Sequence, residues 1–202
     1  MRLIFIDTQD AVVSTLKRKF EAKGTCCAPE IMLTFWTGKV QNISDRIDFY
    51  VSPGNSYGVM TGGIDYVYRR MFGQQLQDDL QHEIFFLRNT PEIEVPVGEV
   101  LVIPIRADNR SHQQYFIYAP TMSVPSKIHP DNVGKAFKAI FLELLKIKAI
   151  SNVDFNVVIP GLGTLSGGVS PEDHAEQIVN TFNKVLFERE INKAFNYSSQ
   201  IQ

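Results

Sequence analysis

The sequence runs V-S-P-G-N-S-Y-G-V-M-T-G-G-I-D from Val51 to Asp65. An apolar run at residues 47–51 leads into it, and apolar positions at helical spacing follow from Ile64 onward. A strand, a loop rich in Gly and Asn, and a helix together present free backbone N–H groups to an anion. The loop glycines also let a ligand approach the main chain closely. The loop is therefore a candidate binding site.

A second glycine-rich loop occupies residues 161–171, with the sequence G-L-G-T-L-S-G-G-V-S-P. It follows the apolar run at 157–160 and precedes the last predicted helix, for which Ser170 is the expected N-cap and Pro171 the first helical residue. Two loops that can each hold an anion, in one small domain, predict a ligand with more than one phosphate.

Apolar β-forming runs alternate with amphipathic segments along most of the chain. Helices are predicted around residues 13–20, 64–84, 133–144 and 171–186, and strands at 3–6, 31–36, 47–51, 100–105, 115–119 and 157–159. The segment 64–84 is either one long helix or two helices joined near Gly73, and Asp131 is a candidate cap for the helix that follows it. Continuous apolar strands are typical of a sheet covered on both faces. The predicted fold class is α/β, with three α/β/α layers and a mixed, mostly parallel sheet.

The length of 202 residues, 44% of them hydrophobic, is sufficient for one well-buried core. We expect a single domain over residues 1–202, with its core at about 3–188 and a peripheral tail at 189–202 that is frayed or weakly docked. In sheets of this class ligands bind beyond the C-terminal ends of the strands. Both glycine-rich loops and the segment 119–122 are expected there.

Charge and cysteine content narrow the possible partners. Lys and Arg total 20 against 22 Asp and Glu, for a formal charge of −2, which argues against a nucleic-acid partner. The two cysteines, Cys26 and Cys27, are adjacent, and no Cys/His cluster has metal-ligand spacing. We therefore expect reduced thiols, with no role as a nucleophile, and neither a metal nor a cofactor.

The first apolar run stops at Asp7, and no run of about 20 apolar residues occurs. These features predict a soluble, cytoplasmic protein with no membrane partner, and they leave its oligomeric state open.

The order of elements, together with both loops, resembles the macro domain, a family of ADP-ribose-binding modules. The resemblance covers about residues 3–188. The family's first loop commonly has the form V-N-A-A-N followed by G-G-G-V-D, and the positions here that fall into step with it are Val51, Asn55, Gly62, Gly63, Ile64 and Asp65. In its S-P-G-N-S-Y-G-V-M form, the loop is most similar to the stand-alone branch often labelled phage-tail-like macro proteins.

The resemblance implies roles for individual residues. Asn55 and Asp65 are the candidate catalytic residues. Asn55 would contact the distal ribose, and Asp65 would orient or deprotonate a water near the anomeric carbon in members that hydrolyse ADP-ribosyl esters. Backbone N–H groups of the second loop would hold the diphosphate. The candidate ligand-binding residues are Asp7, Lys39, Val40, Gly54, Tyr57, Gly62, Gly63, Ile64, Gly161, Leu162, Gly163, Thr164, Leu165, Ser166, Gly167, Gly168 and Val169.

Two positions depart from the family pattern. Ser52 stands where many members have a first Asn, and Lys39 stands where the family usually has an Asp that receives the adenine amino group. Asp7, at the end of the first predicted strand, is the candidate substitute, with backbone groups of Lys39 and Val40 supplying the rest. The second loop also lacks the aromatic residue often found beside the distal ribose. A side chain of the first loop, Tyr57 or Met60, could fill that space.

Each candidate also has a purely structural interpretation. Asn55 could merely stabilise its own loop, because an Asn between glycines readily bonds its backbone. Asp65 could be an acidic residue favoured at a helix N-terminus. The four histidines lie in polar segments and are expected at the surface rather than as general bases. Ser166 is expected to bind phosphate, since no nucleophile elbow or triad is visible.

These observations leave three functions open. The leading hypothesis is an ADP-ribose-recognising protein that removes ADP-ribose from proteins or acts on a phosphorylated ADP-ribose, with ADP-ribose or an ADP-ribosylated protein as its partner. The second is a non-catalytic reader of ADP-ribose or of a related nucleotide signal. The third is an interaction or virion-associated protein that kept the fold and lost the pocket.

Overall fold

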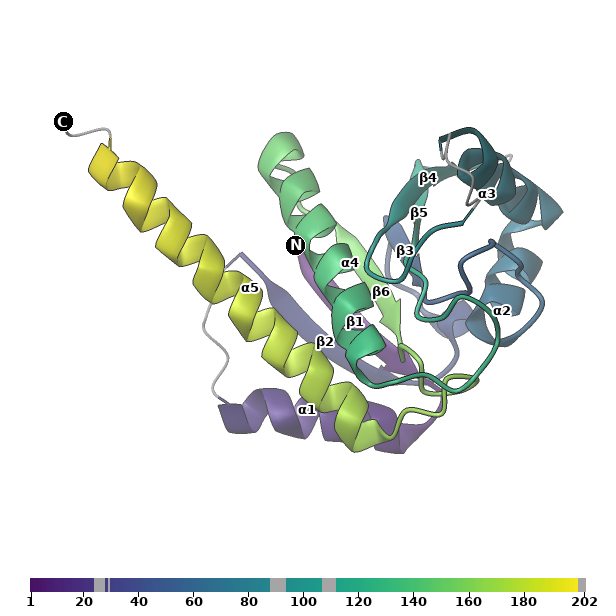
Figure 1. Cartoon of the computed structure of the whole chain (residues 1–202), viewed down its shortest axis with the longest axis horizontal. Coiled ribbons are helices and arrows are strands. Elements are labelled where there is room, and N and C mark those ends of the chain that lie inside the picture. The colour runs from purple at the N-terminus through teal and green to yellow at the C-terminus, as the bar shows by residue number, and fades with distance from the viewer. Residues whose placement is uncertain (24–27, 29, 88–93, 107–111, 200–202) are drawn as a thin grey trace.

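The computed structural model describes the chain except residues 24–27, 29, 88–93, 107–111 and 200–202, and its strands form one sheet (Figure 1). The strands are β1 (Arg2–Asp7), β2 (Met32–Thr37), β3 (Phe49–Ser52), β4 (Leu101–Ile105), β5 (Gln114–Tyr118) and β6 (Asn156–Pro160). Their order across the sheet is β2-β1-β6-β3-β5-β4, and all neighbouring pairs are parallel except β4 with β5. The predicted mixed, mostly parallel sheet is confirmed.

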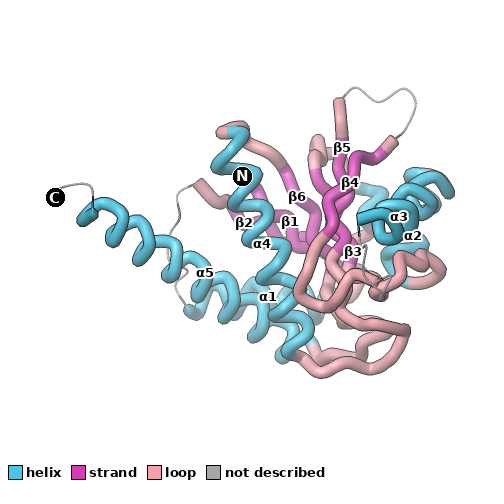
Figure 2. The backbone as a smooth tube through the Cα atoms, turned by 45° about the horizontal axis from the view of Figure 1, so that its top comes forward, coloured by secondary structure: helices cyan, strands magenta, loops and turns pink. Residues whose placement is uncertain are grey.

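Helices cover both faces of this sheet (Figures 1 and 2). They are α1 (Asp10–Lys23), α2 (Gly63–Phe72), α3 (Gln74–Leu87), α4 (Asp131–Ser151) and α5 (Pro171–Ser199), with a short 3₁₀ helix η1 (Val40–Asn42) after β2. One core cluster joins the sheet to α1, α4 and α5, and a second joins it to α2 and α3. Alternate residues of β1 point to opposite faces, so Leu3 and Phe5 enter the first cluster while Ile4 and Ile6 enter the second. The predicted three-layer α/β/α architecture is therefore confirmed.

Helix ends differ in places from those predicted by the pattern. The segment after Gly62 forms two helices that separate at Gly73, where a φ of 90° breaks the helical path. Pro130, not Asp131, is the N-cap of α4, and Asp131 is its first helical residue. The Oγ of Ser170 accepts a hydrogen bond from the Asp173 N–H at 3.1 Å, as expected of an N-cap.

The last helix is longer than predicted. α5 continues to Ser199, whereas fraying was expected after Glu188. Arg189, just beyond that point, donates to Glu30 Oε1 at 2.8 Å, so the helix still contacts the body of the molecule there. The tail is therefore helical and not frayed over residues 189–199, while the alternative of a weakly docked tail stays a prediction.

Three of the sequence-based expectations concern the cysteines, metal binding and membrane-spanning helices. The adjacent Cys26 and Cys27 lie outside the described residues. Within the described part of the chain, no group of three or more His, Cys, Asp or Glu side chains could hold a metal ion. No helix among the described residues is long and apolar enough to cross a membrane.

His174 contradicts the expectation that all histidines lie at the surface. It sits in the first turn of α5 and is only 2% exposed, beside Ile6, Val13 and Gly161. Its Nδ1 has no hydrogen-bond partner among the described residues. Burial lowers the pKa of His174 from 6.5 to about 4, because the apolar surroundings disfavour the imidazolium.

The buried imidazole predicts a loss of stability in mild acid. Between pH 6.5 and about 4 the imidazole of residue 174 is protonated in the unfolded chain but stays neutral in the native state. The free energy of unfolding therefore falls as the pH is lowered through this range. Relative to His174→Leu, the wild type is expected to lose up to roughly 3 kcal/mol over this range. Urea denaturation of both proteins at pH 7.5, 6 and 4.5 measures the difference. A wild type that loses no more stability than His174→Leu over this range would contradict the prediction.

Candidate ligand-binding site

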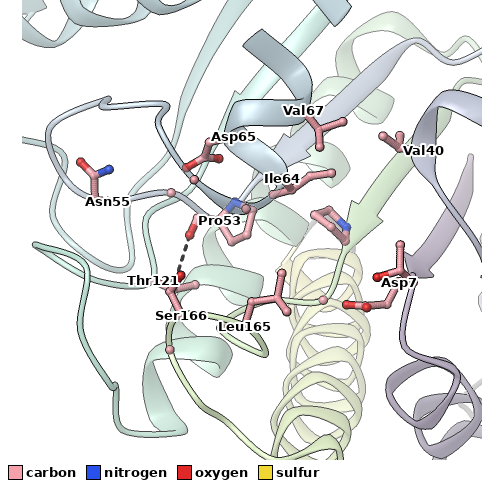
Figure 3. A pocket seen from close by; sticks show the side chains of 18 of the residues that line it. Asp7, Val40, Pro53, Asn55, Ile64, Asp65, Val67, Thr121, Leu165 and Ser166 are labelled. Carbon is pink, nitrogen blue, oxygen red and sulfur yellow. Dashed lines mark hydrogen bonds between the residues drawn. The ribbon is translucent and has the colours of Figure 1, made fainter. Parts of the chain in front are cut away.

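A cavity of about 600 Å³ opens beyond the C-terminal ends of the central parallel strands (Figure 3). This volume lies within the range of roughly 300–1,000 Å³ typical of small-molecule sites. Five segments line the cavity: residues 6–8 at the end of β1, residues 38–41 around the start of η1, the first glycine-rich loop, residues 121–125 after β5, and the second glycine-rich loop. Both loops therefore face the same space, although about a hundred residues separate them in the chain.

The second loop exposes backbone donors to the cavity. The N–H groups of Gly168 and Val169 are used inside the loop, where they donate to Leu165 O and Gly163 O at 3.0 Å. The N–H groups of Leu165, Ser166 and Gly167 have no acceptor among the described residues, and all three residues line the cavity. Successive free N–H groups on a concave loop form a site for an anion.

Asp65 lies in the first turn of α2, at the cavity wall next to the first loop (Figure 3). Its side chain is 7% exposed, and the Ser52 hydroxyl donates a hydrogen bond to its Oδ1. Burial raises the pKa of Asp65 from 3.8 to about 6, and the hydrogen bond from Ser52 opposes this shift only in part. The carboxyl group is thus poised to change its protonation state close to neutral pH, as acid and base catalysts often do.

Gly54 makes room for this carboxyl group. A Cβ at position 54 would lie 2.7 Å from Asp65 Oδ2 and 2.6 Å from both the ring and the hydroxyl of Tyr118. The Tyr118 hydroxyl itself donates to the backbone carbonyl of Asn55. The glycine is therefore required by the close approach of two side chains from different elements.

The side chain of Asn55 forms hydrogen bonds within its own loop. Its Oδ1 accepts from the N–H groups of Tyr57 at 3.1 Å and Val59 at 3.4 Å, and its Nδ2 donates to Val59 O at 2.7 Å. These bonds fix the loop that forms one end of the cavity, in line with the structural interpretation of this residue. Asn55 also lines the cavity, so a ligand contact at its exposed edge stays a prediction.

The opposite end of the cavity holds Asp7 and a group of apolar side chains (Figure 3). Asp7 Oδ1 accepts from the Gln9 N–H at 2.8 Å, and the Thr164 hydroxyl donates to Oδ2 at 3.4 Å. Each carboxylate oxygen can accept a further bond, so Asp7 retains acceptor capacity toward the cavity. Apolar side chains from three elements, β1, η1 and α2, line the cavity on this side: Ile6, Val40, Ile64 and Val67.

Most sequence-predicted site residues line the cavity, namely Asp7, Lys39, Val40, Gly54, Asn55, Gly62, Gly63, Ile64, Asp65, Gly161, Gly163, Leu165, Ser166 and Gly167. The structure does not place the others on its wall. Leu162 and Val169 belong to the hydrophobic core, and Thr164 turns its hydroxyl to Asp7 and to Gly161 O. Gly168 is exposed and is not among the lining residues, and it has a φ of 66°.

Neither of the two side chains suggested for the space beside the distal ribose lines the cavity. Tyr57 is 44% exposed and outside the cavity wall, and Met60 is fully buried in the core cluster under α2 and α3.

Sequence reasoning missed several lining residues, chiefly those outside glycine-rich stretches: Thr8, Gln41, Pro53, Val59, Thr61, Val67, Thr121, Met122, Pro125 and Pro160. Thr121 contributes to the shape of the wall, since its hydroxyl donates to Pro53 O at 2.9 Å and joins the loop after β5 to the loop after β3 (Figure 3). Its position just beyond a predicted parallel strand was the signal that could have identified it.

Fold and site together define an α/β protein with a ligand cavity at the carboxyl edge of its parallel strands. Residues 51–178 match the model of the Macro domain family. The chain therefore belongs to the macro domain family.

Individual relatives agree with this assignment. An uncharacterized protein of Aquifex aeolicus (strain VF5) is 30% identical over 138 residues, which are 68% of this chain and 73% of that protein. The macrodomain of Mycobacterium tuberculosis DarG superposes with a TM-score of 0.57 at 20% identity, covering 76% of this chain and 91% of that one. A mutant of the Oceanobacillus iheyensis macrodomain, solved with ADPR, gives a TM-score of 0.54 at 18% identity, covering 69% and 71%. The two structures share the fold with this chain.

Proposed function

We propose that this protein binds ADP-ribose, either free or attached to a protein. The observation that carries the proposal is the convergence of both glycine-rich loops on one cavity, whose wall includes Leu165, Ser166 and Gly167, with N–H groups that have no acceptor among the described residues. Such a loop suits a diphosphate, which offers several anionic oxygens to backbone donors. Membership of the macro domain family, and the ADPR in the structure of the Oceanobacillus iheyensis relative, support the same ligand.

The chemistry of the two ends suggests how the ligand lies. The apolar walls formed by Val40, Ile64 and Val67 suit a flat purine base, and Asp7 beside them can accept a hydrogen bond from an exocyclic amine. Asn55, Asp65 and Thr121 at the other end suit the hydroxyls of a ribose. In this arrangement Asp7 replaces the acidic residue that Lys39 displaces from the family pattern.

Asp65 favours a second candidate function, the hydrolysis of ADP-ribosyl esters. A buried carboxyl group whose pKa burial raises to about 6 is partly ionised near neutral pH and can take a proton from a water as it attacks the anomeric carbon. Oxygens of the neighbouring diphosphate would share in positioning that water. Without this step the protein is a reader of ADP-ribose.

The proposal also covers the partner of the protein, its domain organisation and its location. The formal charge of −2 supports a small-molecule or protein partner rather than a nucleic acid. We propose one domain over residues 1–202 and a cytoplasmic location, with the modified carrier protein presenting its ADP-ribosyl group to the cavity mouth.

Calorimetry with ADP-ribose tests binding, and incubation with a mono-ADP-ribosylated protein tests turnover. Binding by the wild type that Asp7→Ala weakens at least about tenfold supports the assigned ligand orientation, since one hydrogen bond to a charged group contributes roughly 1.5–3 kcal/mol. Asp45→Ala, which removes a carboxylate at the surface, is the matched control and should bind normally. Absence of binding heat from the wild type contradicts the proposed ligand. Release of ADP-ribose that is unchanged in Asp65→Ala contradicts the catalytic role.

A further inference from the structure

Strand β2 lies at one end of the sheet, and no further strand of the described residues pairs with its outer side (Figure 2). Its sequence, M-L-T-F-W-T, contains neither a proline nor a charged residue. The strand at the opposite end, β4, contains Pro104, and proline protects a sheet edge because it has no N–H to offer. The central residues of β2 are half-buried, whereas those of its neighbour β1 are buried. β2 is therefore an edge strand without the usual protection against pairing.

Hydrogen bonds at both ends of β2 show which of its backbone groups point outward. The Met32 N–H donates to Met1 O at 3.0 Å, and the Gly38 N–H donates to Asp7 O at 2.9 Å. In a parallel pair, alternate residues of a strand bond to the same neighbour, so the even-numbered residues of β2 face β1. The N–H and C=O groups of the odd-numbered residues point away from the sheet and have no partner in the described part of the chain. These residues are Leu33, Phe35 and Thr37.

We propose that two copies of this chain pair through β2, in antiparallel orientation and about a twofold axis at Phe35. In this register Phe35 lies opposite its counterpart, and Leu33 of each copy lies opposite Thr37 of the second copy. Residues opposite each other at such positions exchange both of their backbone hydrogen bonds. Every outward N–H of one copy then meets an outward C=O of the second copy, so one register satisfies the whole edge. The inference goes beyond the proposed function and does not depend on it.

The side chains of β2 suit pairing with a second copy. Leu33 and Phe35 are half-buried against the core cluster under α1, α4 and α5, and a paired strand would cover more of both. On the other face of the sheet, the half-buried Trp36 would lie beside Thr34 of the second copy. Because β2 carries no charge, no like charges meet along the paired strands.

Charged groups beyond the ends of β2 fit the same register. The pairing that places Leu33 opposite Thr37 also brings Lys39 of one copy close to Glu30 of the second copy. The Lys39 side chain is exposed and has no partner among the described residues of its own chain. Glu30 accepts from Arg189 at 2.8 Å, and a carboxylate can accept further bonds. Opposite charges thus meet at both ends of the paired strands.

Amide hydrogen exchange, followed by NMR at several protein concentrations, tests the inference because it examines β2 one residue at a time. The amides of Thr34 and Trp36 face β1 and should be protected at every concentration. The amides of Leu33, Phe35 and Thr37 should become protected as chains pair. When about nine-tenths of the chains are paired, exchange at these three amides should slow about tenfold, because it proceeds through the unpaired chain. Sedimentation equilibrium of the same samples gives the paired fraction.

Thr37→Pro is the deciding variant, and Thr37→Ala is its matched control. Both changes remove the hydroxyl that donates to Asp10 Oδ1 at 2.9 Å, but only proline lacks the outward N–H. Because this N–H has no acceptor among the described residues, the single copy should stay folded, which circular dichroism verifies. Thr37→Pro is expected to weaken pairing at least about tenfold, since each pair loses a hydrogen bond at both ends of the paired strands. Thr37→Ala should pair like the wild type.

Three results would overturn the inference. The first is a wild type that sediments as a single chain up to about 1 mM, a concentration that detects even weak pairing. The second is a pair in which the outward amides exchange as fast as in the single chain, because another surface then holds it together. The third is equal pairing by folded Thr37→Pro and Thr37→Ala. Calorimetry with ADP-ribose decides the proposed function separately from all three.

Discussion

Replacing Gly54 by alanine is expected to destabilise the protein and to abolish tight ligand binding. The new Cβ would stand 2.6 Å from the Tyr118 ring and 2.7 Å from Asp65 Oδ2, far inside contact distance. Tyr118 is fully buried and cannot swing away, so the loop or the carboxyl group must shift. Overpacking of this kind typically costs about 1–3 kcal/mol. Urea denaturation measures the loss of stability, and calorimetry with ADP-ribose should show at least about a hundredfold weaker binding, equivalent to roughly 2.7 kcal/mol.

A neighbouring glycine provides the control for this result. A Cβ at Gly62 would have no atom within 4 Å, and its φ of −145° suits any residue. Gly62→Ala should therefore leave the free energy of unfolding within about 0.5 kcal/mol of the wild type. Equal stability of the two variants would contradict the tight packing of Gly54 against Tyr118 and Asp65.

Changing Asp65 to asparagine is expected to stabilise the protein at neutral and alkaline pH. The native carboxyl group holds its proton up to about pH 6, while the unfolded chain loses it near pH 3.8. The unfolded state therefore binds fewer protons in this interval, and the stability of the wild type falls as the pH rises from about 4 to about 6. At pH 7.5 the accumulated cost is roughly 3 kcal/mol, which Asp65→Asn should recover.

The pH dependence separates this effect from ordinary changes in packing. The stability gained by Asp65→Asn should vanish below about pH 4, where the carboxyl group is neutral in both states. Asp45→Asn, at a half-exposed surface position, should show no comparable gain at any pH. Urea denaturation of the variants at pH 8, 6 and 4 measures these differences. A gain that stays constant from pH 8 to pH 4 would show that charge burial is not its cause.

The buried Asp65 carboxyl group reduces the stability of the protein at neutral pH. Burial beside Ser52 and Tyr118 keeps the carboxyl group at the cavity wall in a form that can gain or lose a proton near neutral pH. A neutral residue of the same shape would fold more favourably. This loss in the free energy of unfolding is consistent with a role in ligand binding or catalysis, because natural proteins often retain destabilising groups at such sites.

The histidines show how far a local pattern can mislead. The polar neighbours of His174 indicated a surface position, yet it lies four residues before Ile178 on the buried stripe of α5. That spacing places it on the core face of the helix, and only the packing of this turn below Gly161 decides that the ring is enclosed. The helical period was available in the sequence, but polarity outweighed it.

The sequence by itself determined the α/β class, the two glycine-rich loops at the carboxyl ends of strands, and the presence of Asn55 and Asp65 in the first of them. These features follow from short-range patterns of apolar spacing, glycine and helix caps, which act within a few residues. Only the folded structure decided that Tyr57 lies outside the cavity wall and that Asp65 is buried beside Ser52 with no cationic partner among the described residues. Those outcomes depend on contacts with residues far along the chain, such as Tyr118, whose positions only the folded sheet fixes.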